Sequence, residues 1–453
     1  MTLLDLPNIQ GFVVRGYRLP VAAYLFLRVE DPIKASKWVS FAADEVITAA
    51  PWSEKPDAGI NVAFTCAGLE ALGVPAFSLG DFPLEFREGM AARAELLGDT
   101  EKSDPSRWEK PFDPGSAVHA MVMISAKDDD ALAAHRDKVC QRIEEYGGFT
   151  LLATQIGKAL EDDKEHNHEH FGYVDGIGQP SIEGSGVAPL PGQGAVDKKG
   201  DWRPIRAGEF ILGYLDEEGV LPPAATPDQL VVNGSYLVYR KLRQDVAGFR
   251  RQLMKAAERY PGNEEKLAAK LVGRWRDGTP LVLSPEEPDQ SLADDRMRNN
   301  AFSYCDDRQG SSCPVGGHIR RANPRDSLPF EGKLVNRHRM IRRGISYGPE
   351  LPPGAEDDGE DRGLIFTSLQ ASIERQFEFV QSQWMNEGNV FGVGDDQDAV
   401  IGSQDRDPPR KMLVPGCPPF FMDNLARMVE CAGGEYFFTP GINGLHFISA
   451  ADG

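Results

Sequence analysis

Cysteine is scarce in this sequence, and segments for export or membrane insertion are missing. Only six of the 453 residues are cysteine, and no two of them form a CxxC pair. A zinc knuckle and a disulfide framework are therefore excluded as the basis of the fold. The first residues, MTLLDLPNIQGF, do not resemble a secretory signal, and no apolar run is long enough to span a bilayer. These absences predict a cytoplasmic protein that does not bind membranes.

Positive charge is also scarce. The chain has 49 lysines and arginines against 69 aspartates and glutamates, which gives a net charge of −20. Such a chain repels phosphate backbones, so nucleic acid is excluded as a partner. There is no GxxxxGK[ST] phosphate loop, and no CxxCH motif for covalent haem attachment. Clusters of arginine inside this acidic chain must therefore interact with something specific.

Segments that read as a β-strand followed by a helix recur along the chain. Before a Pro/Gly-rich stretch at 185–207 they are 21–47, 59–74 and 117–147, with a further strand at 149–157; after it they are 209–217, 234–257 and 363–385. We therefore expect an α+β protein with an N-terminal domain over residues 1–210 and a C-terminal domain over residues 211–453. Two acidic segments that contain glycine or proline, 352–362 and 392–410, are expected to be solvent loops.

The segment HNHEHFGYVDGIGQPSI, residues 166–182, places Asp175 among several glycines. Glycines at this density let the backbone approach a flat ligand closely and aim one carboxylate at it. A glycine-rich turn closed by an Asx hydrogen bond is the simpler explanation of the local sequence. The period-two histidines of HNHEH predict either a metal site on one strand face or, more simply, a polar lead-in to the Asp175 loop.

Two further segments are unusually basic. In CPVGGHIRRANPRD, residues 313–326, His318 follows two glycines and precedes several arginines. A neutral imidazole beside a cationic cluster suits haem, because iron binds the nitrogen and arginine pairs with the carboxylates. A solvated histidine in a basic surface loop is the alternative. In NRHRMIRRGISYGPE, residues 336–350, Arg342 and Arg343 either end a salt-bridged strand or stabilise an oxyanion in a pocket.

In this order, the three segments resemble the motifs of the dye-decolourising peroxidase family. GYVDG is similar to the family's distal GxxDG motif, HIRRANPR to its proximal histidine motif, and MIRRGISYG to its distal arginine motif. The flanking stretches FTCAGLEALG, LVGRWRDGTPL and SLQASIERQFEFVQ also resemble the family. The resemblance implies two ferredoxin-like halves, each an antiparallel sheet with peripheral helices. It also implies one non-covalent haem b per chain, bound mainly by the C-terminal half.

The resemblance assigns a role to each of seven residues. These are His318 as the iron ligand, Asp175 and Arg342 as the distal catalytic pair, Arg320 as a partner of a haem propionate, Leu364 and Phe366 as lining of the distal pocket, and Glu374 as the carboxylate that accepts the other N–H of the histidine. Each role matches its residue type, since a carboxylate can move a proton and arginine carries a fixed charge. A carboxylate stays ionised in mild acid, where a histidine is largely protonated, so activity is expected to extend to low pH.

The function implied is a haem peroxidase. It reduces hydrogen peroxide through a ferryl intermediate and oxidises bulky phenolic or dye-like aromatic electron donors. The alternatives are a haem-handling protein that removes iron from haem and a haem-storage protein. A carrier needs no acid–base group above the iron, so the pair Asp175 and Arg342 favours the enzyme. The sequence leaves open a homo-oligomer, and a role for Trp202, Trp275, Trp384 or Tyr347 in relaying electrons rather than in packing.

Overall fold

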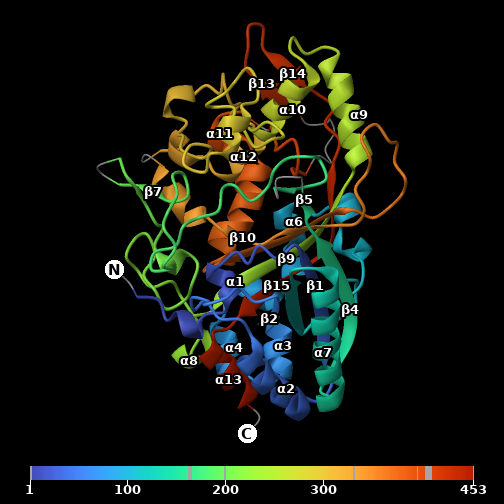
Figure 1. Ribbon diagram of the computed structural model, residues 1–453, viewed down its shortest axis with the longest axis vertical. Coiled ribbons are helices and arrows are strands. Elements are labelled where there is room, and N and C mark those ends of the chain that lie inside the picture. The colour runs from blue at the N-terminus through green and yellow to red at the C-terminus, as the bar shows by residue number, and fades with distance from the viewer. Residues whose placement is uncertain are drawn as a thin grey trace.

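A computed structural model describes residues 3–161, 166–197, 200–329, 332–394, 396–403 and 411–451. A nine-stranded antiparallel sheet runs through the middle of the molecule (Figure 1). Its strands are β1 (Val21–Val29), β2 (Ala58–Phe64), β3 (Ala120–Ala126), β4 (Phe149–Lys158), β9 (Ser235–Gln244), β10 (Ile341–Arg342), β11 (Ile345–Tyr347), β12 (Gly363–Gln370) and β15 (Val429–Thr439). They are ordered β10-β12-β9-β15-β2-β3-β1-β4, with β11 paired to β12.

Both faces of this sheet are buried, which explains its nearly continuous apolar strands. Along β1 the odd-numbered residues from Val21 to Leu27 face one core, and the even-numbered residues from Ala22 to Phe26 face a second core. The same alternation continues in β9, where Val238 faces the first core and Tyr239 the second. Further along β9, the face that carries Val238 borders a cavity instead of a core, and Leu242 lines it.

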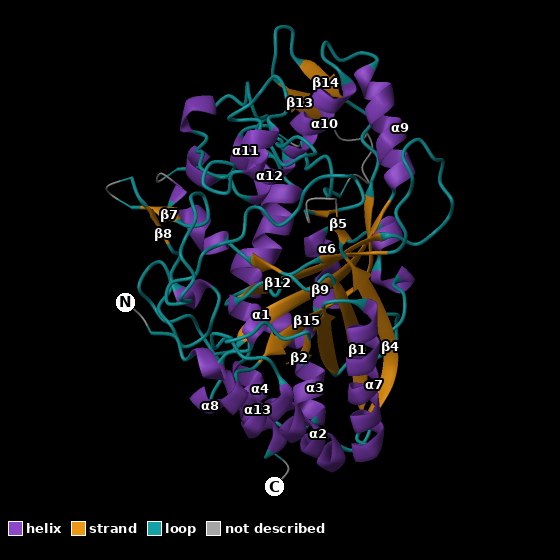
Figure 2. Ribbon diagram, viewed as in Figure 1, coloured by secondary structure: helices purple, strands orange, loops and turns teal. Residues whose placement is uncertain are grey.

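Helices cover the first face of the sheet, and others lie among the loops beyond its opposite end (Figure 2). They are α1 (Gly11–Val14), α2 (Pro32–Glu45), α3 (Cys66–Ala71), α4 (Ala76–Asp81), α5 (Leu84–Glu88), α6 (Ala94–Leu97), α7 (Asp129–Tyr146), α8 (Asp228–Val231), α9 (Val246–Ala257), α10 (Glu264–Val272), α11 (Gln290–Asp294), α12 (His318–Ala322) and α13 (Ile442–Ser449). Helix α7 begins where the Asp128 side chain accepts the N–H of Ala131 at 2.8 Å, and it ends at Gly147 in the left-handed region. No helix of the described residues is long and apolar enough to cross a membrane.

Three short two-stranded sheets complete the described structure. They are β5 (Leu160–Glu161) with β6 (Asn167–His168), β7 (Ala195–Val196) with β8 (Trp202–Arg203), and β13 (Met412–Val414) with β14 (Phe420–Met422). In Figure 1 the last pair lies with α9 and α10 at the top of the molecule, whereas α2, α7 and α13 lie at the bottom. The large sheet therefore separates a helical base from an upper lobe that is rich in loops.

The two halves of the chain share the large sheet. Strands β1 to β4 come from the first half, and they join the later strands through the pairing of β2 with β15 at Phe64 and Phe438. At the ends of the order, β11 packs on β4, since a Cβ at Gly157 would lie 2.4 Å from Cγ2 of Ile345. The α+β architecture with antiparallel strands and peripheral helices is confirmed. The division near residue 210 stays a prediction.

Most of the expected strand and helix pairs are present, but two expectations are wrong. The segment 209–217 forms no strand, because Phe210–Leu212 is fully buried in irregular backbone and Gly213 follows with φ +89°. The acidic segment 392–410 is not simply a solvent loop, because Asp396 and Asp398 are buried, at 4% and 0% exposed. Residues 395 and 404–410 of that segment lie outside the described part of the chain.

Candidate functional site

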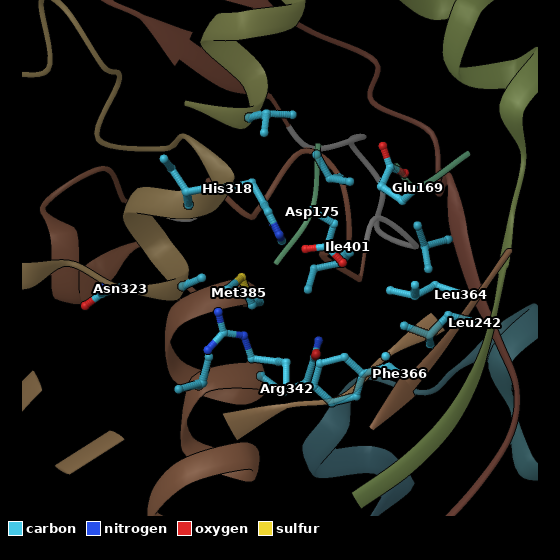
Figure 3. A pocket seen from close by; sticks show the side chains of 18 of the residues that line it. Glu169, Asp175, Leu242, His318, Asn323, Arg342, Leu364, Phe366, Met385 and Ile401 are labelled. Atoms are coloured by element: carbon cyan, nitrogen blue, oxygen red, sulfur yellow. The ribbon is translucent and has the colours of Figure 1, made fainter. Parts of the chain in front are cut away.

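A cavity of about 370 Å³ lies beside the end of β9, within the usual size range of ligand pockets. Five of the seven residues assigned from the sequence line it: Asp175, His318, Arg342, Leu364 and Phe366. They come from the glycine-rich loop, the first turn of α12, β10 and β12. Figure 3 shows His318 and Arg342 pointing into the same space from two sides, with Phe366 and Leu364 along the strands. The fold thus brings together segments that are far apart in the chain.

His318 is held by a buried carboxylate that the sequence did not reveal. Its Nδ1 lies 3.0 Å from Oδ2 of Asp398, whose side chain is fully buried. Because an ionised carboxylate can only accept, Nδ1 carries the proton and donates it to this bond, so Nε2 keeps its lone pair toward the cavity. Burial alone would lower the pKa of His318, but the charge and hydrogen bond of Asp398 raise it above its ordinary value. Burial would raise the pKa of Asp398, and His318 holds it below its usual range.

The loop that carries Asp398 is fixed in two ways. The other carboxylate oxygen, Oδ1, accepts the N–H groups of Val400 and Ile401 at 2.9 and 2.8 Å. Arg321 on α12 reaches across and donates to the carbonyls of Trp384 at 2.8 Å and of Asp396 at 2.9 Å. The histidine and its carboxylate are therefore positioned by the same short helix.

Two sequence-based assignments are corrected by these contacts. Glu374 was expected to accept the N–H of His318, but Asp398 occupies that position, and Glu374 lies outside the cavity with its backbone N–H 3.3 Å from Oε1 of Glu85. Arg320 was expected to contact a haem propionate, but it does not line the cavity. It is buried 4.3 Å from the centre of the Tyr304 ring. The assignments failed because spacing in the sequence does not show which way a side chain turns.

The Arg320 guanidinium is occupied by the protein itself. It donates to the carbonyl of Cys313 at 2.7 Å and lies 3.3 Å from Oδ2 of Asp307. Asp307 in turn accepts the N–H of Cys313 at 2.8 Å. Arg320 therefore ties together the loop that leads into α12 and helps to place His318 indirectly.

Asp175 borders the cavity at the tip of a tight loop. Its Oδ1 accepts the N–H of Gly176 at 2.6 Å, while its own N–H donates to the carbonyl of Asn167 at 2.9 Å. Gly172 and Gly176 have φ of +93° and +82°, which side chains other than glycine rarely adopt. A glycine-rich turn is therefore present, although its side-chain bond goes to the next residue and does not close an Asx turn, and Asp175 lines the cavity.

Arg342 approaches the same loop from β10. Its N–H donates to Oε1 of Gln179 at 3.0 Å, and its Nη1 donates to the carbonyl of Met340 at 2.7 Å. A Cβ at Gly178 would lie 3.6 Å from its Nη2, an ordinary contact distance, so the guanidinium lies close to the glycine-rich loop. Burial lowers the pKa of Arg342, and the negative charge of Asp175 partly offsets this effect. Asp175 and Arg342 thus act electrostatically on each other at the cavity wall.

Arg343 is different from its neighbour, although both precede Gly344. Its Nε donates to the carbonyl of Phe12 at 2.8 Å, and its Nη1 donates to the carbonyl of Arg342 at 3.1 Å. It does not line the cavity that holds His318. The geometry therefore favours Arg342 over Arg343 as the arginine that acts inside the cavity.

A second, larger cavity of about 870 Å³ adjoins the first. The two share lining residues, including Asp175, Arg342 and Leu364. The carboxylate and the guanidinium therefore stand where the outer cavity meets the inner one.

The histidines of HNHEH do not converge on a metal site. His168 Nδ1 lies 3.3 Å from the carbonyl of Gly172, whereas His170 Nε2 lies 2.8 Å from the carbonyl of Tyr347. In the part of the chain that the structure describes, no group of three histidine, cysteine, aspartate or glutamate side chains is placed to hold a metal ion. These contacts support the reading of HNHEH as a lead-in to the Asp175 loop.

Two family models match most of the chain. The model described as the DyP dimeric alpha+beta barrel domain matches residues 8–153. The model described as Dyp-type peroxidase, C-terminal, matches residues 216–393. The second match includes His318, Arg342 and the strand β12.

The chain is also similar to known proteins and to solved structures over nearly its full length. The chain is 31% identical to a dye-decolorizing peroxidase of Mycena epipterygia, over 99% of this chain and 88% of that protein. The structure of an ancestral D-type dye decolorizing peroxidase matches with a TM-score of 0.85 and 29% identity, over 98% of this chain and 99% of that one. A dye-decolorizing peroxidase in complex with 2,6-dimethoxyphenol matches with a TM-score of 0.82 and 29% identity, over 99% and 100%. The chain therefore belongs to the dye-decolorizing peroxidase family of haem enzymes.

Proposed function

We propose that this enzyme reduces hydrogen peroxide and oxidises bulky phenolic or dye-like donors on a non-covalent haem b, with His318 on the iron. One observation carries the proposal: the His318 imidazole, tied to the buried Asp398, shares its cavity with the pair Asp175 and Arg342. The residues fit haem, because the imidazole keeps a lone pair toward the cavity and the surrounding walls are largely apolar. Those walls include Leu242, Leu364, Phe366, Met385 and Ile401 (Figure 3). Most lining residues come from the second half of the chain.

His318 and Asp398 form the side that holds the iron. Bound haem supplies the redox chemistry, and its tuning depends on the axial ligand and the ligand's hydrogen bond. Asp398 fixes the tautomer and the orientation of the imidazole and makes it a stronger electron donor. The N–H groups of Val400 and Ile401 hold the carboxylate in place for this task.

Asp175 and Arg342 form the side that meets peroxide. The carboxylate of Asp175 accepts the proton of one peroxide oxygen and delivers it to the departing oxygen. Arg342 places a fixed positive charge where negative charge develops as the O–O bond breaks. The apolar side chains of Leu364 and Phe366 exclude water, which strengthens both electrostatic effects.

The donor class is supported by the outer cavity and by a relative. The outer cavity is about 870 Å³, and it opens onto Asp175 and Arg342. A similar structure contains 2,6-dimethoxyphenol, a phenol. Together these support an aromatic donor that reaches the site through the outer cavity.

The direct test is the absorption spectrum of the purified protein. We expect a Soret band that shifts when hydrogen peroxide is added, followed by steady-state oxidation of 2,6-dimethoxyphenol. The proposal is contradicted if the protein shows no Soret band after haem reconstitution, or if the band does not shift when hydrogen peroxide is added.

Removal of iron from haem is the alternative activity, and its products distinguish it from peroxidase activity. Over 34% of its length the chain is 29% identical to a deferrochelatase of Yersinia pestis. Mass spectrometry after turnover distinguishes the two, because a peroxidase returns its porphyrin with the iron still bound. Accumulation of iron-free porphyrin as the main product would favour iron removal instead.

A further inference from the structure

Three arginines line the inner cavity near one another: Arg325, Arg339 and Arg342. Arg339 is only 6% exposed. Burial, together with the positive charges of Arg342 and Arg325, lowers the pKa of Arg339 to about 9. No carboxylate acts on Arg339 among the described residues. A buried cation in this position is costly unless something anionic compensates it.

The neighbouring arginines have either several protein acceptors or a nearby carboxylate, whereas Arg339 has neither among the described residues. Arg325 donates to the carbonyls of Asn300 and Phe302 and to the side-chain oxygen of Asn300. Arg342 donates to the carbonyl of Met340, and the negative charge of Asp175 stabilises its positive charge. Within the described part of the chain, the side chain of Arg339 makes a single hydrogen bond, from Nη2 to the carbonyl of Gly178 at 3.2 Å. An arginine offers five N–H donors, so most of its hydrogen-bonding capacity remains for a ligand.

We propose that Arg339 binds a carboxylate of the cofactor and receives from it the negative charge that the chain does not supply. This inference rests on the proposed haem peroxidase function, because haem b brings two carboxylates into this cavity. Planar guanidinium and carboxylate groups pair through two parallel hydrogen bonds. Arg339 thus takes the role that the sequence assigned to Arg320, whose guanidinium is occupied by Asp307 and Cys313.

The test compares haemin with haemin dimethyl ester, in which both carboxylates are blocked. Each is titrated into haem-free protein and followed by the Soret band, which needs no turnover. We expect the parent protein to prefer haemin by at least about 30-fold, and Arg339→Leu to lose most of this preference. Arg339→Lys keeps the positive charge but lacks the planar guanidinium, so it should restore part of the preference for haemin.

Arg320→Leu is the matched control, because it also removes a buried arginine close to His318. It is expected to weaken both ligands by similar factors and to leave their ratio unchanged. Equal affinity of the parent for haemin and its ester, or an undiminished preference in Arg339→Leu, would overturn the inference while leaving the peroxidase proposal intact. Failure of the parent to bind haemin at all would overturn the proposed function itself.

Thermal unfolding provides a readout that a merely structural arginine would not give. Removing an uncompensated buried cation should raise the Tm of the haem-free protein, whereas the haem-loaded variant should melt below the haem-loaded parent. If Arg339→Leu lowers Tm in both forms, Arg339 is structural and the inference fails. If Arg339→Leu does not fold, Arg339→Gln is measured in the same way.

Discussion

Two segments with three arginines each, HIRRANPR at 318–325 and RMIRR at 339–343, use arginine differently. In the first, Arg320 and Arg321 are satisfied by carbonyls and a carboxylate of the chain, and they build the support of His318. In the second, Arg339 and Arg342 line the cavity with few protein partners. The comparison teaches that an arginine is structural where the fold supplies acceptors, and is free to serve a ligand where the fold does not.

The largest expected effect is the loss of haem when His318, the first residue of the first segment, is replaced. His318→Ala should lose haem or hold it weakly, because the other imidazole in the lining, His338, is stacked on Phe379 and has its Nδ1 2.6 Å from the carbonyl of Arg375. The haem content of the purified variant, measured by the Soret band relative to protein, checks this. Circular dichroism controls for folding, and a full band with an unchanged ligand-field spectrum would remove His318 as the iron ligand.

The next largest effect is on the rate of the reaction with peroxide, and it concerns Asp175, in the loop beside Arg342. Asp175→Asn preserves shape but removes the base, so the reaction with peroxide should slow by about 10²–10⁴-fold. Single-turnover stopped flow is the proper measurement, because it separates the reaction with peroxide from oxidation of the donor. Equal rates for both proteins would eliminate Asp175 as the acid–base group.

A smaller effect separates the two arginines before Gly344. Arg342→Leu should slow the same single-turnover reaction by about 10²–10³-fold while haem remains bound, since a fixed charge at the breaking bond is lost. Arg343→Leu removes bonds to the carbonyls of Phe12 and Arg342, so it should cost about 1–3 kcal/mol of stability and change the rate little. The opposite ranking in stopped flow would reverse the assignment.

The smallest expected effect is on haem affinity. It compares Asp398, the carboxylate that the structure places beside His318, with Glu374, the one expected from the sequence. Asp398→Asn should weaken haem binding by about 10–100-fold, because the imidazole loses its anionic partner. Glu374→Gln should leave haem affinity within about twofold, because Glu374 does not line the cavity. Soret titration of both variants checks the pair, and equal losses would restore Glu374 as a partner of His318.

Sequence patterns and motifs were sufficient for the parts of the molecule that depend on local structure. Segments such as 21–47 and 117–147 contain strand alternation followed by helical spacing, and these patterns determine β1, α2, β3 and α7. Phe210–Leu212 was misjudged because an apolar run does not distinguish a strand from buried irregular backbone. The motifs around Asp175, His318 and Arg342 were recognisable because each depends on neighbours within a few residues.

Only the tertiary structure decided which groups meet. Asp398 lies 80 residues from His318, in an acidic segment whose composition indicated a solvent loop. The different fates of Arg320 and Arg339 likewise depend on acceptors that come from distant segments, or are missing. Spacing along the chain predicts a side chain's local conformation, but burial and pairing of charges are set by long-range contacts. The sequence by itself therefore determined the family, the main elements and the three central residues, and the fold determined how their charges are held.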